Sequence, residues 1–180
     1  MIVINGHEIG PEAELEGANF AGMDFRGVNL RWANLDGADL RGADLRGVNL
    51  EGVFLQGANL KGANLEGADL RGALLRNANF SGANLHLVNL KKADLQDANL
   101  QGANFTMACL KKARLQGVNF TRVNFHRADL RKVDLQGADL QGVNLQGADL
   151  GDSDLENADL RGADLRYANL WGADLTDTKF

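Results

Sequence analysis

Every fifth residue from Leu15 to Phe180 is leucine or phenylalanine, with no insertion, deletion or change of phase. A step of five over this range makes 34 consecutive five-residue repeats. Self-similarity at one short, fixed period indicates that a single local structure is stacked on itself. The sequence therefore predicts one solenoid, whose task has to be sought where the pattern breaks.

The repeat unit combines a short extended segment with a corner. Two residues before each leucine or phenylalanine, here called the centre, stands Ala in most repeats and Val in eight. Between them stands Asn or Asp in 28 of the 34 repeats, and a polar residue and then typically Gly follow the centre. Apolar residues in alternation predict an extended segment with both apolar side chains inside. Gly accepts a positive φ and Asn or Asp bonds the nearby backbone, so the remaining residues predict a turn. In an α-helix successive centres would drift by about 140°, which argues against that structure.

Two kinds of residue recur at a spacing of 20. They are the cation pairs Lys91-Lys92, Lys111-Lys112 and Arg131-Lys132, and the phenylalanines Phe105 and Phe125. Segments that turn the same way at every corner must coil, and the coils must stack to satisfy their backbone groups. The spacing of 20 predicts four repeats per coil, and hence about 8.5 coils in a rod about 40 Å long.

The tract from Ala38 to Gly47 reads Ala-Asp-Leu-Arg-Gly twice and resembles the pentapeptide-repeat family, whose signature is A-(D/N)-L-x-x. The resemblance covers residues 13–180, and the regular pattern also looks like the cyanobacterial members. It implies an all-β fold, a right-handed quadrilateral parallel β-helix with four pentapeptides in each coil. It also implies that two copies can meet at the C-terminal end, as they do in some members.

The two ends of the stack need separate explanations because an exposed coil edge invites pairing. Ile2 to Ile4, followed by Asn5-Gly6, predict a strand and turn, and we expect residues 1–12 to form a cap on a single repeat domain of residues 13–180. Three alternatives stay open at the other end. Either Tyr167, Trp171 and Phe180 shield the last coil, or two molecules form a homodimer there, or the natural chain continues.

The formal net charge of −5 opposes general affinity for nucleic acid or for an anionic membrane. The single Cys109 excludes an intrachain disulfide, the N-terminus lacks the pattern of a secretory signal, and no stretch is long and apolar enough to span a bilayer. We therefore expect a cytoplasmic protein that contacts neither a membrane nor nucleic acid directly.

The first break in the pattern is a basic ladder, which we define as Lys91, Lys92, Lys111, Lys112, Arg131 and Lys132. The predicted coil stacks these cations on one face over three coils. Two ammonium groups about 6 Å apart in water repel each other by only about 0.7 kcal/mol, so the arrangement is tolerable. It is interpreted either as a solvated face or as an anion-binding strip for an acidic partner or a phosphate backbone.

The second break is apolar. Phe54 and Leu74 replace Asn or Asp and lie 20 residues apart, as do Leu87 and Met107 at a position where Gly is usual. Each pair would either cover itself across adjacent coils or form an apolar contact with a partner.

No catalytic set, cofactor site or metal site is predicted. Cys109 is the single cysteine and has no histidine at ligand spacing, so it is interpreted as a small filler. His86 and His126 would lie about 10 Å apart, too far for one metal ion. A filled rod is also expected to lack a pocket, so the chain is not expected to be an enzyme.

Two functions fit these observations. The first is a rigid, non-enzymatic scaffold that binds a protein partner on its flat faces. The second follows from the resemblance alone: some family members mimic duplex DNA and bind type II topoisomerases, protecting them from quinolones. The C-terminal aspartates Asp149, Asp152, Asp154, Asp159, Asp164 and Asp174 would serve that role, whereas the basic ladder speaks against it.

Overall fold

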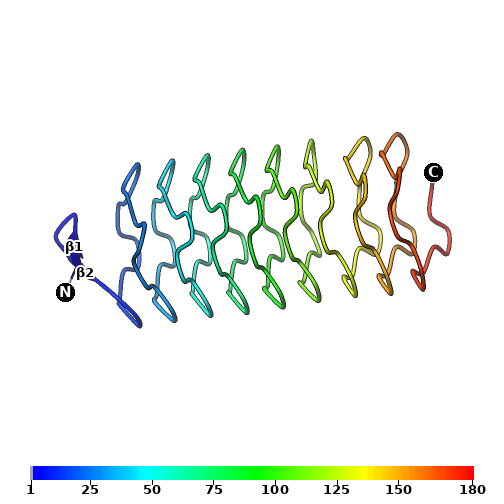
Figure 1. Ribbon diagram of the computed structural model, residues 1–180. Coiled ribbons are helices and arrows are strands. Elements are labelled where there is room, and N and C mark those ends of the chain that lie inside the picture. The colour runs from blue at the N-terminus through cyan, green and yellow to red at the C-terminus, as the bar shows by residue number, and fades with distance from the viewer. Residues whose placement is uncertain (1) are drawn as a thin grey trace.

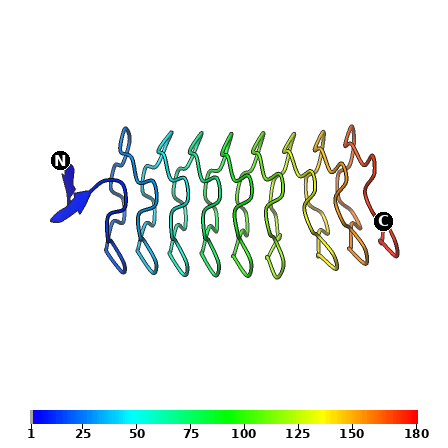
Figure 2. The same ribbon diagram turned by 90° about the horizontal axis from the view of Figure 1, so that it is seen from below.

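The computed structural model describes residues 2–180 and shows a right-handed quadrilateral β-helix (Figures 1 and 2). The chain winds into square coils that stack along one axis. Parallel bridges join residues 20 apart along the tube, from Glu14 with Asn34 to Asp159 with Lys179. The expectation of four repeats per coil is therefore confirmed. We name the four faces after their first centres: the Leu15, Phe20, Phe25 and Leu30 faces.

Backbone hydrogen bonds explain why this repeat forms this coil. Leu35 N donates to Phe54 O at 2.8 Å, and Phe54 N donates back to Ala33 O at 3.0 Å. At the corner Ala38 N donates to Leu35 O at 3.0 Å, which closes a turn with Gly37 at φ 67°. A positive φ at the third turn residue is typical of a type II turn and favours glycine. The Asn or Asp side chain accepts the N–H two residues on, as in Ser81 N to Asn79 Oδ1 at 3.0 Å.

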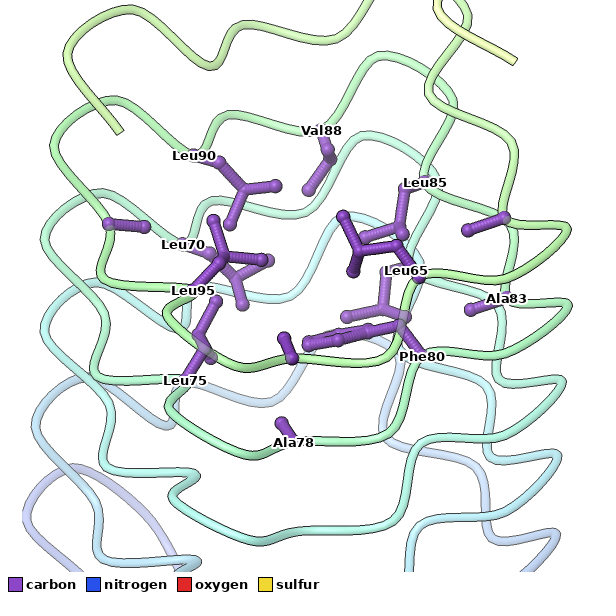
Figure 3. Packing of buried hydrophobic residues seen from close by; sticks show 14 of the residues in the cluster. Leu65, Leu70, Leu75, Ala78, Phe80, Ala83, Leu85, Val88, Leu90 and Leu95 are labelled. Atoms are coloured by element: carbon purple, nitrogen blue, oxygen red, sulfur yellow. The ribbon is translucent and has the colours of Figure 1, made fainter. Parts of the chain in front are cut away.

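The core is a narrow column of centres and Ala or Val residues inside the tube. Every centre from Leu15 to Leu160 is buried. Figure 3 shows Leu65 and Leu85, Leu70 and Leu90, and Leu75 and Leu95 pointing inward from successive coils. Burying one leucine side chain contributes about 2 kcal/mol, so stacked centres supply most of the favourable free energy of folding.

A hairpin lies at the N-terminal end of the tube (Figure 1). Strand β1 (Ile2–Ile4) pairs antiparallel with β2 (His7–Ile9). Ile9 is buried in the core cluster, and the His7 ring meets the Phe20 ring edge to face at 5.4 Å. The side chain of Asn5 donates to Asn19 O at 2.8 Å. The hairpin is thus attached to the first coil by apolar, aromatic and polar contacts.

The aromatic residues of the last coil do not cover it. Tyr167, Trp171 and Phe180 are 88%, 77% and 67% exposed. The centres Leu165, Leu170 and Leu175 of the last coil are only partly buried, so the aromatic side chains leave this end of the core partly open.

One step of the stack departs from the regular pattern. Asn119 and Asp139 are the one facing pair between Glu14 and Lys179 that forms no bridge, and the coils are visibly wider apart there (Figure 2, yellow-green to yellow). This coil holds the bulky interior residues Val118, Phe120, Val123 and Phe125. The Phe125 ring lies 6.0 Å from Phe120 and 5.3 Å from Phe105. Extra interior volume forces backbone shifts, and we attribute the opening to it.

Candidate binding face

The residue two places after each centre forms the corner of the coil. All 34 corner residues, from position 12 to position 177, have φ between 53° and 75°. Nineteen of them are glycine, which takes this conformation without steric cost. Other L-residues lose about 1–2 kcal/mol there, although Asn and Asp tolerate it better.

Ten corners carry a residue other than Gly, Asn or Asp. They are Glu12, Trp32, Leu87, Lys92, Met107, Lys112, Arg122, Arg127, Lys132 and Tyr167. Nine of the ten lie on the two corners that border the Leu30 face, and Arg122 is the exception. Backbone strain kept at particular positions is a mark of functional sites. The corner residues that strain the backbone are thus concentrated along the two edges of the Leu30 face.

The basic ladder forms one edge of this face. Lys92 N donates to Lys111 O and Lys112 N donates to Arg131 O, both at 3.1 Å, so the ladder cations lie on three adjacent coils. Among residues 2–180, no carboxylate lies within 4.0 Å of Lys91, Lys92, Lys111 or Lys112. These four ammonium groups are the unpaired charges of the ladder.

The third cation pair of the basic ladder, Arg131 and Lys132, differs from the other two pairs. Arg131 forms two hydrogen bonds with Asp129, at 2.8 and 2.7 Å, and lies 3.5 Å from Asp149. The hydrogen bond to Asp129 raises the pKa of the Arg131 guanidinium above its usual value, and the charge of Asp149 adds to the effect. Lys132 lies 3.6 Å from Asp152. The charges of this third pair are therefore largely neutralised by the neighbouring aspartates.

Leu87 and Met107 form the opposite edge, which we call the apolar ridge. They are 48% and 47% exposed, and Leu87 N donates to Thr106 O at 3.0 Å, which places them on adjacent coils. The extended segment between ridge and ladder spans three residues, or about 10 Å. Cys109 lies between them, half-buried, with its sulfur 3.9 Å from Asp129 Oδ2. Ridge and ladder thus frame one strip of the Leu30 face.

A hollow of about 280 Å³ lies where the ladder begins, lined by Trp32, Glu51, Arg71, Gly72, Lys91 and Lys92. The expectation that the rod offers no pocket is therefore wrong at this corner. The hollow exists because one corner carries an indole while the next two carry glycine. Reading the corner residues at intervals of 20 would have grouped Trp32 with Lys92.

The other predicted contact pair lies elsewhere, on the Leu15 face. Phe54 and Leu74 are bridged on successive coils, Phe54 half-buried and Leu74 36% exposed. Above them the buried Asp94 accepts hydrogen bonds from Arg76 at 2.7 Å and Arg114 at 3.1 Å. Arg114 therefore has a partner within the tube and adds no free charge to the basic ladder.

The two histidines are held by the coil in different ways. His86 Nδ1 lies 2.9 Å from Thr106 O, whereas His126 Nδ1 is buried without a hydrogen-bond partner. No group of three or more potential ligands within residues 2–180 is arranged to hold a metal ion. This part of the chain also contains no helix that is long and apolar enough to cross a membrane.

Fold and face together define a rigid solenoid that displays side chains outward. The sequence profile described as "Pentapeptide repeats", with eight copies, matches overlapping segments that span residues 13–180. The chain belongs to the pentapeptide-repeat family. Proteins of this family are in general structural or interaction modules. No curated protein matches the chain.

Several solved structures are similar. HetL, a pentapeptide-repeat protein involved in heterocyst differentiation regulation from the cyanobacterium Nostoc sp. strain PCC 7120, is 39% identical over 93% of this chain and 73% of its own, with a TM-score of 0.59. Rfr23 from the cyanobacterium Cyanothece 51142 is 33% identical over 61% of this chain and 86% of its own, with a TM-score of 0.33. QnrB1, a plasmid-mediated fluoroquinolone resistance protein, is 19% identical over 89% of this chain and 90% of its own, with a TM-score of 0.47.

Proposed function

We propose that this protein is a rigid, non-enzymatic binding module that docks an acidic protein partner on its Leu30 face. The observation that carries the proposal is the placement of strained corners: nine of the ten bulky ones border this face. Glycine at these corners would make the tube more stable. Side chains retained at a cost in stability are best explained by a use outside the tube.

The chemistry of the strip supports an acidic partner with some apolar surface. Four unpaired lysines attract carboxylates, while Leu87 and Met107 offer exposed apolar area on the opposite edge. Charge complementarity of this kind steers association and sets orientation. HetL is involved in heterocyst differentiation regulation, and a role in regulation through binding is part of our proposal for this chain.

The alternative, a DNA-mimicking topoisomerase binder, receives less support. Four of the six C-terminal aspartates are in ion pairs: Asp149 with Arg131, Asp152 with Lys132, Asp159 with Arg161 and Asp164 with Arg166. Pairing reduces the negative potential that a mimic of duplex DNA needs. A gyrase supercoiling assay tests the alternative, which requires inhibition or quinolone protection at micromolar protein.

The proposal is tested with glycine substitutions. Lys92→Gly, Lys112→Gly and Lys132→Gly together remove the outer cations of the ladder and restore the usual corner residue, so the fold is retained. Binding to an oligoglutamate peptide is measured at low ionic strength, where charge attraction is screened least. We expect the triple variant to bind the peptide more weakly, because two of the four unpaired lysines are removed. Arg122→Gly removes a corner cation on another side of the tube and should leave the affinity unchanged.

Two results would contradict the proposal. One is equal affinity of the wild type and the triple variant for the acidic peptide. The other is a clear preference of the wild type for duplex DNA over oligoglutamate at matched charge, which would assign the ladder to a phosphate backbone. If a partner is captured from a native extract, it should be lost from the triple variant and kept by Arg122→Gly.

A further inference from the structure

The hollow beside the basic ladder is built from one corner column. Trp32, Gly52, Gly72 and Lys92 occupy equivalent corners of four successive coils, with coils about 4.8 Å apart. Gly52 is buried and Gly72 is exposed, although both have the same φ of 66°. A difference in burial between two glycines of identical geometry has to come from a neighbouring side chain.

That side chain is the indole of Trp32. A Cβ added at Gly52 would lie 2.4 Å from Cε3 of Trp32, so the ring rests directly on this glycine. A Cβ at Gly72 would meet nothing within 4 Å. The guanidinium carbon of Arg31 lies 5.7 Å from the Trp32 ring centroid, and Arg31 Nε lies 3.2 Å from Glu51 Oε2. The ring is therefore supported from two sides, and the space over Gly72 stays open.

The charges around the hollow are unevenly compensated. Arg71 is hydrogen-bonded to Asp69 at 2.6 Å and lies 3.6 Å from Glu51. Lys91 and Lys92 have no such partner among the described residues. The hollow thus has an aromatic wall on one side and two unpaired cations on the other.

We infer that this hollow is an anchor site for one aromatic side chain of an acidic partner, with the partner's neighbouring carboxylates on Lys91 and Lys92. The inference rests on the proposed function, which it makes specific. Pockets that hold a whole small molecule measure about 300–1,000 Å³, so a hollow of about 280 Å³ suits a single side chain. Trp is enriched among the residues that dominate binding energy, and aromatic pairs prefer edge-to-face or offset contact.

Two synthetic peptides test the inference: an oligoglutamate with one central phenylalanine, and the same peptide with alanine at that place. Trp171→Phe leaves Trp32 as the one tryptophan, so its emission reports on the hollow. We expect the phenylalanine peptide to bind several-fold to about tenfold more tightly and to shift the Trp32 emission. Trp32→Gly should abolish this preference while leaving the affinity for the alanine peptide unchanged.

A second variant guards against a misfolded Trp32→Gly protein. Gly72→Leu fills the hollow, keeps Trp32 in place and puts leucine at a corner as Leu87 does. It should also remove the preference for phenylalanine. Equal binding of the two peptides by the wild type, or a preference that survives in both variants, would overturn the inference and leave the proposed function intact. Failure of the wild type to bind either peptide would overturn both.

Discussion

The corner that leaves the Leu30 face and the corner that leaves the Phe20 face are made from the same repeat and the same turn. The corner that leaves the Phe20 face is glycine in seven of eight coils, with Arg122 as the exception, and a Cβ at Gly82 or Gly102 would meet open space. The corner that leaves the Leu30 face holds Trp32 and three lysines. Since both corners have room for side chains, space does not decide the difference. The repeat determines the fold, and on the proposed function the side chains at the corners of the Leu30 face are set by a partner outside the tube.

The Phe25 and Leu30 faces also differ, in the row of side chains that precede their centres. On the Phe25 face Asn64, Asn84, Asn104, Asn124 and Asn144 form a continuous ladder, in which each amide donates to the one before at 2.9–3.4 Å. At the same step of the stack, the Leu30 face has Asn89, Cys109 and Asp129. A continuous amide ladder stabilises the stacking of the coils, so the polar side chains of the Phe25 face contribute to the stability of the tube. On the Leu30 face the row of amides is interrupted in the coils that carry the apolar ridge and the basic ladder.

The largest predicted effect distinguishes the inside of the tube from the proposed binding face by comparing two residues that are two positions apart. Leu85→Asp places a carboxylate in the core, where Leu85 is fully buried, and should cost about 5 kcal/mol or more, enough to prevent folding. Leu87→Asp makes the same change on the apolar ridge and should alter stability by less than about 0.5 kcal/mol. Urea unfolding followed by circular dichroism measures both. Similar losses for the two variants would refute the assignment of the ridge to the surface.

The second prediction compares the regular stack with its opening. Ala98 and Ala138 belong to one interior column, but Ala98 is buried and Ala138 is half-buried beside the unbridged pair. Ala98→Leu should overpack the tube and cost about 1–3 kcal/mol. Ala138→Leu should cost less because the widened step has room. Thermal unfolding decides the order, and a larger loss at position 138 would contradict our explanation of the opening.

The third prediction exchanges the two corners. Lys112→Gly should stabilise the tube by about 0.5–1 kcal/mol, because glycine accepts the positive φ that lysine strains to adopt. Gly102→Lys, at the corner that leaves the Phe20 face, should destabilise it by a similar amount. Chemical denaturation of both variants checks the signs. If Lys112→Gly destabilised the protein, the lysines would be part of the frame and the case for a binding face would weaken.

The fold could be predicted from sequence because the repeated unit specifies burial, turn and register together. The spacing of 20 residues between Lys92 and Lys112 already predicted the number of residues in one coil. The hollow could not be predicted, since it depends on the Trp32 ring lying over Gly52. The neutralisation of Arg131 depends on a side-chain rotamer toward Asp129. The wider spacing at Asn119 depends on how much side-chain volume fits inside one coil. The identities of the residues alone do not give this limit.

The smallest predicted effect concerns charge pairing on the side of the tube away from the basic ladder. On the Phe20 face Arg161 forms hydrogen bonds with Asp159 at 2.6 and 2.9 Å and lowers the pKa of that carboxyl from 3.8 to about 2. A carboxyl whose pKa is lower in the folded state contributes its full stability above about pH 4. This contribution is lost as the pH falls toward 2.

Removing the arginine should therefore act only in acid. In Arg161→Gln the Asp159 pKa should return toward 3.8, and the fall in stability between pH 4 and pH 2 should become slightly shallower, because exposed ion pairs contribute little to stability. Lys61→Gln, at an equivalent position without a carboxylate partner, is the matched control and should leave the slope unchanged. An NMR titration of the Asp159 carboxyl is the direct check. A wild-type pKa near 3.8 would show that Arg161 and Asp159 do not form the ion pair seen on the Phe20 face.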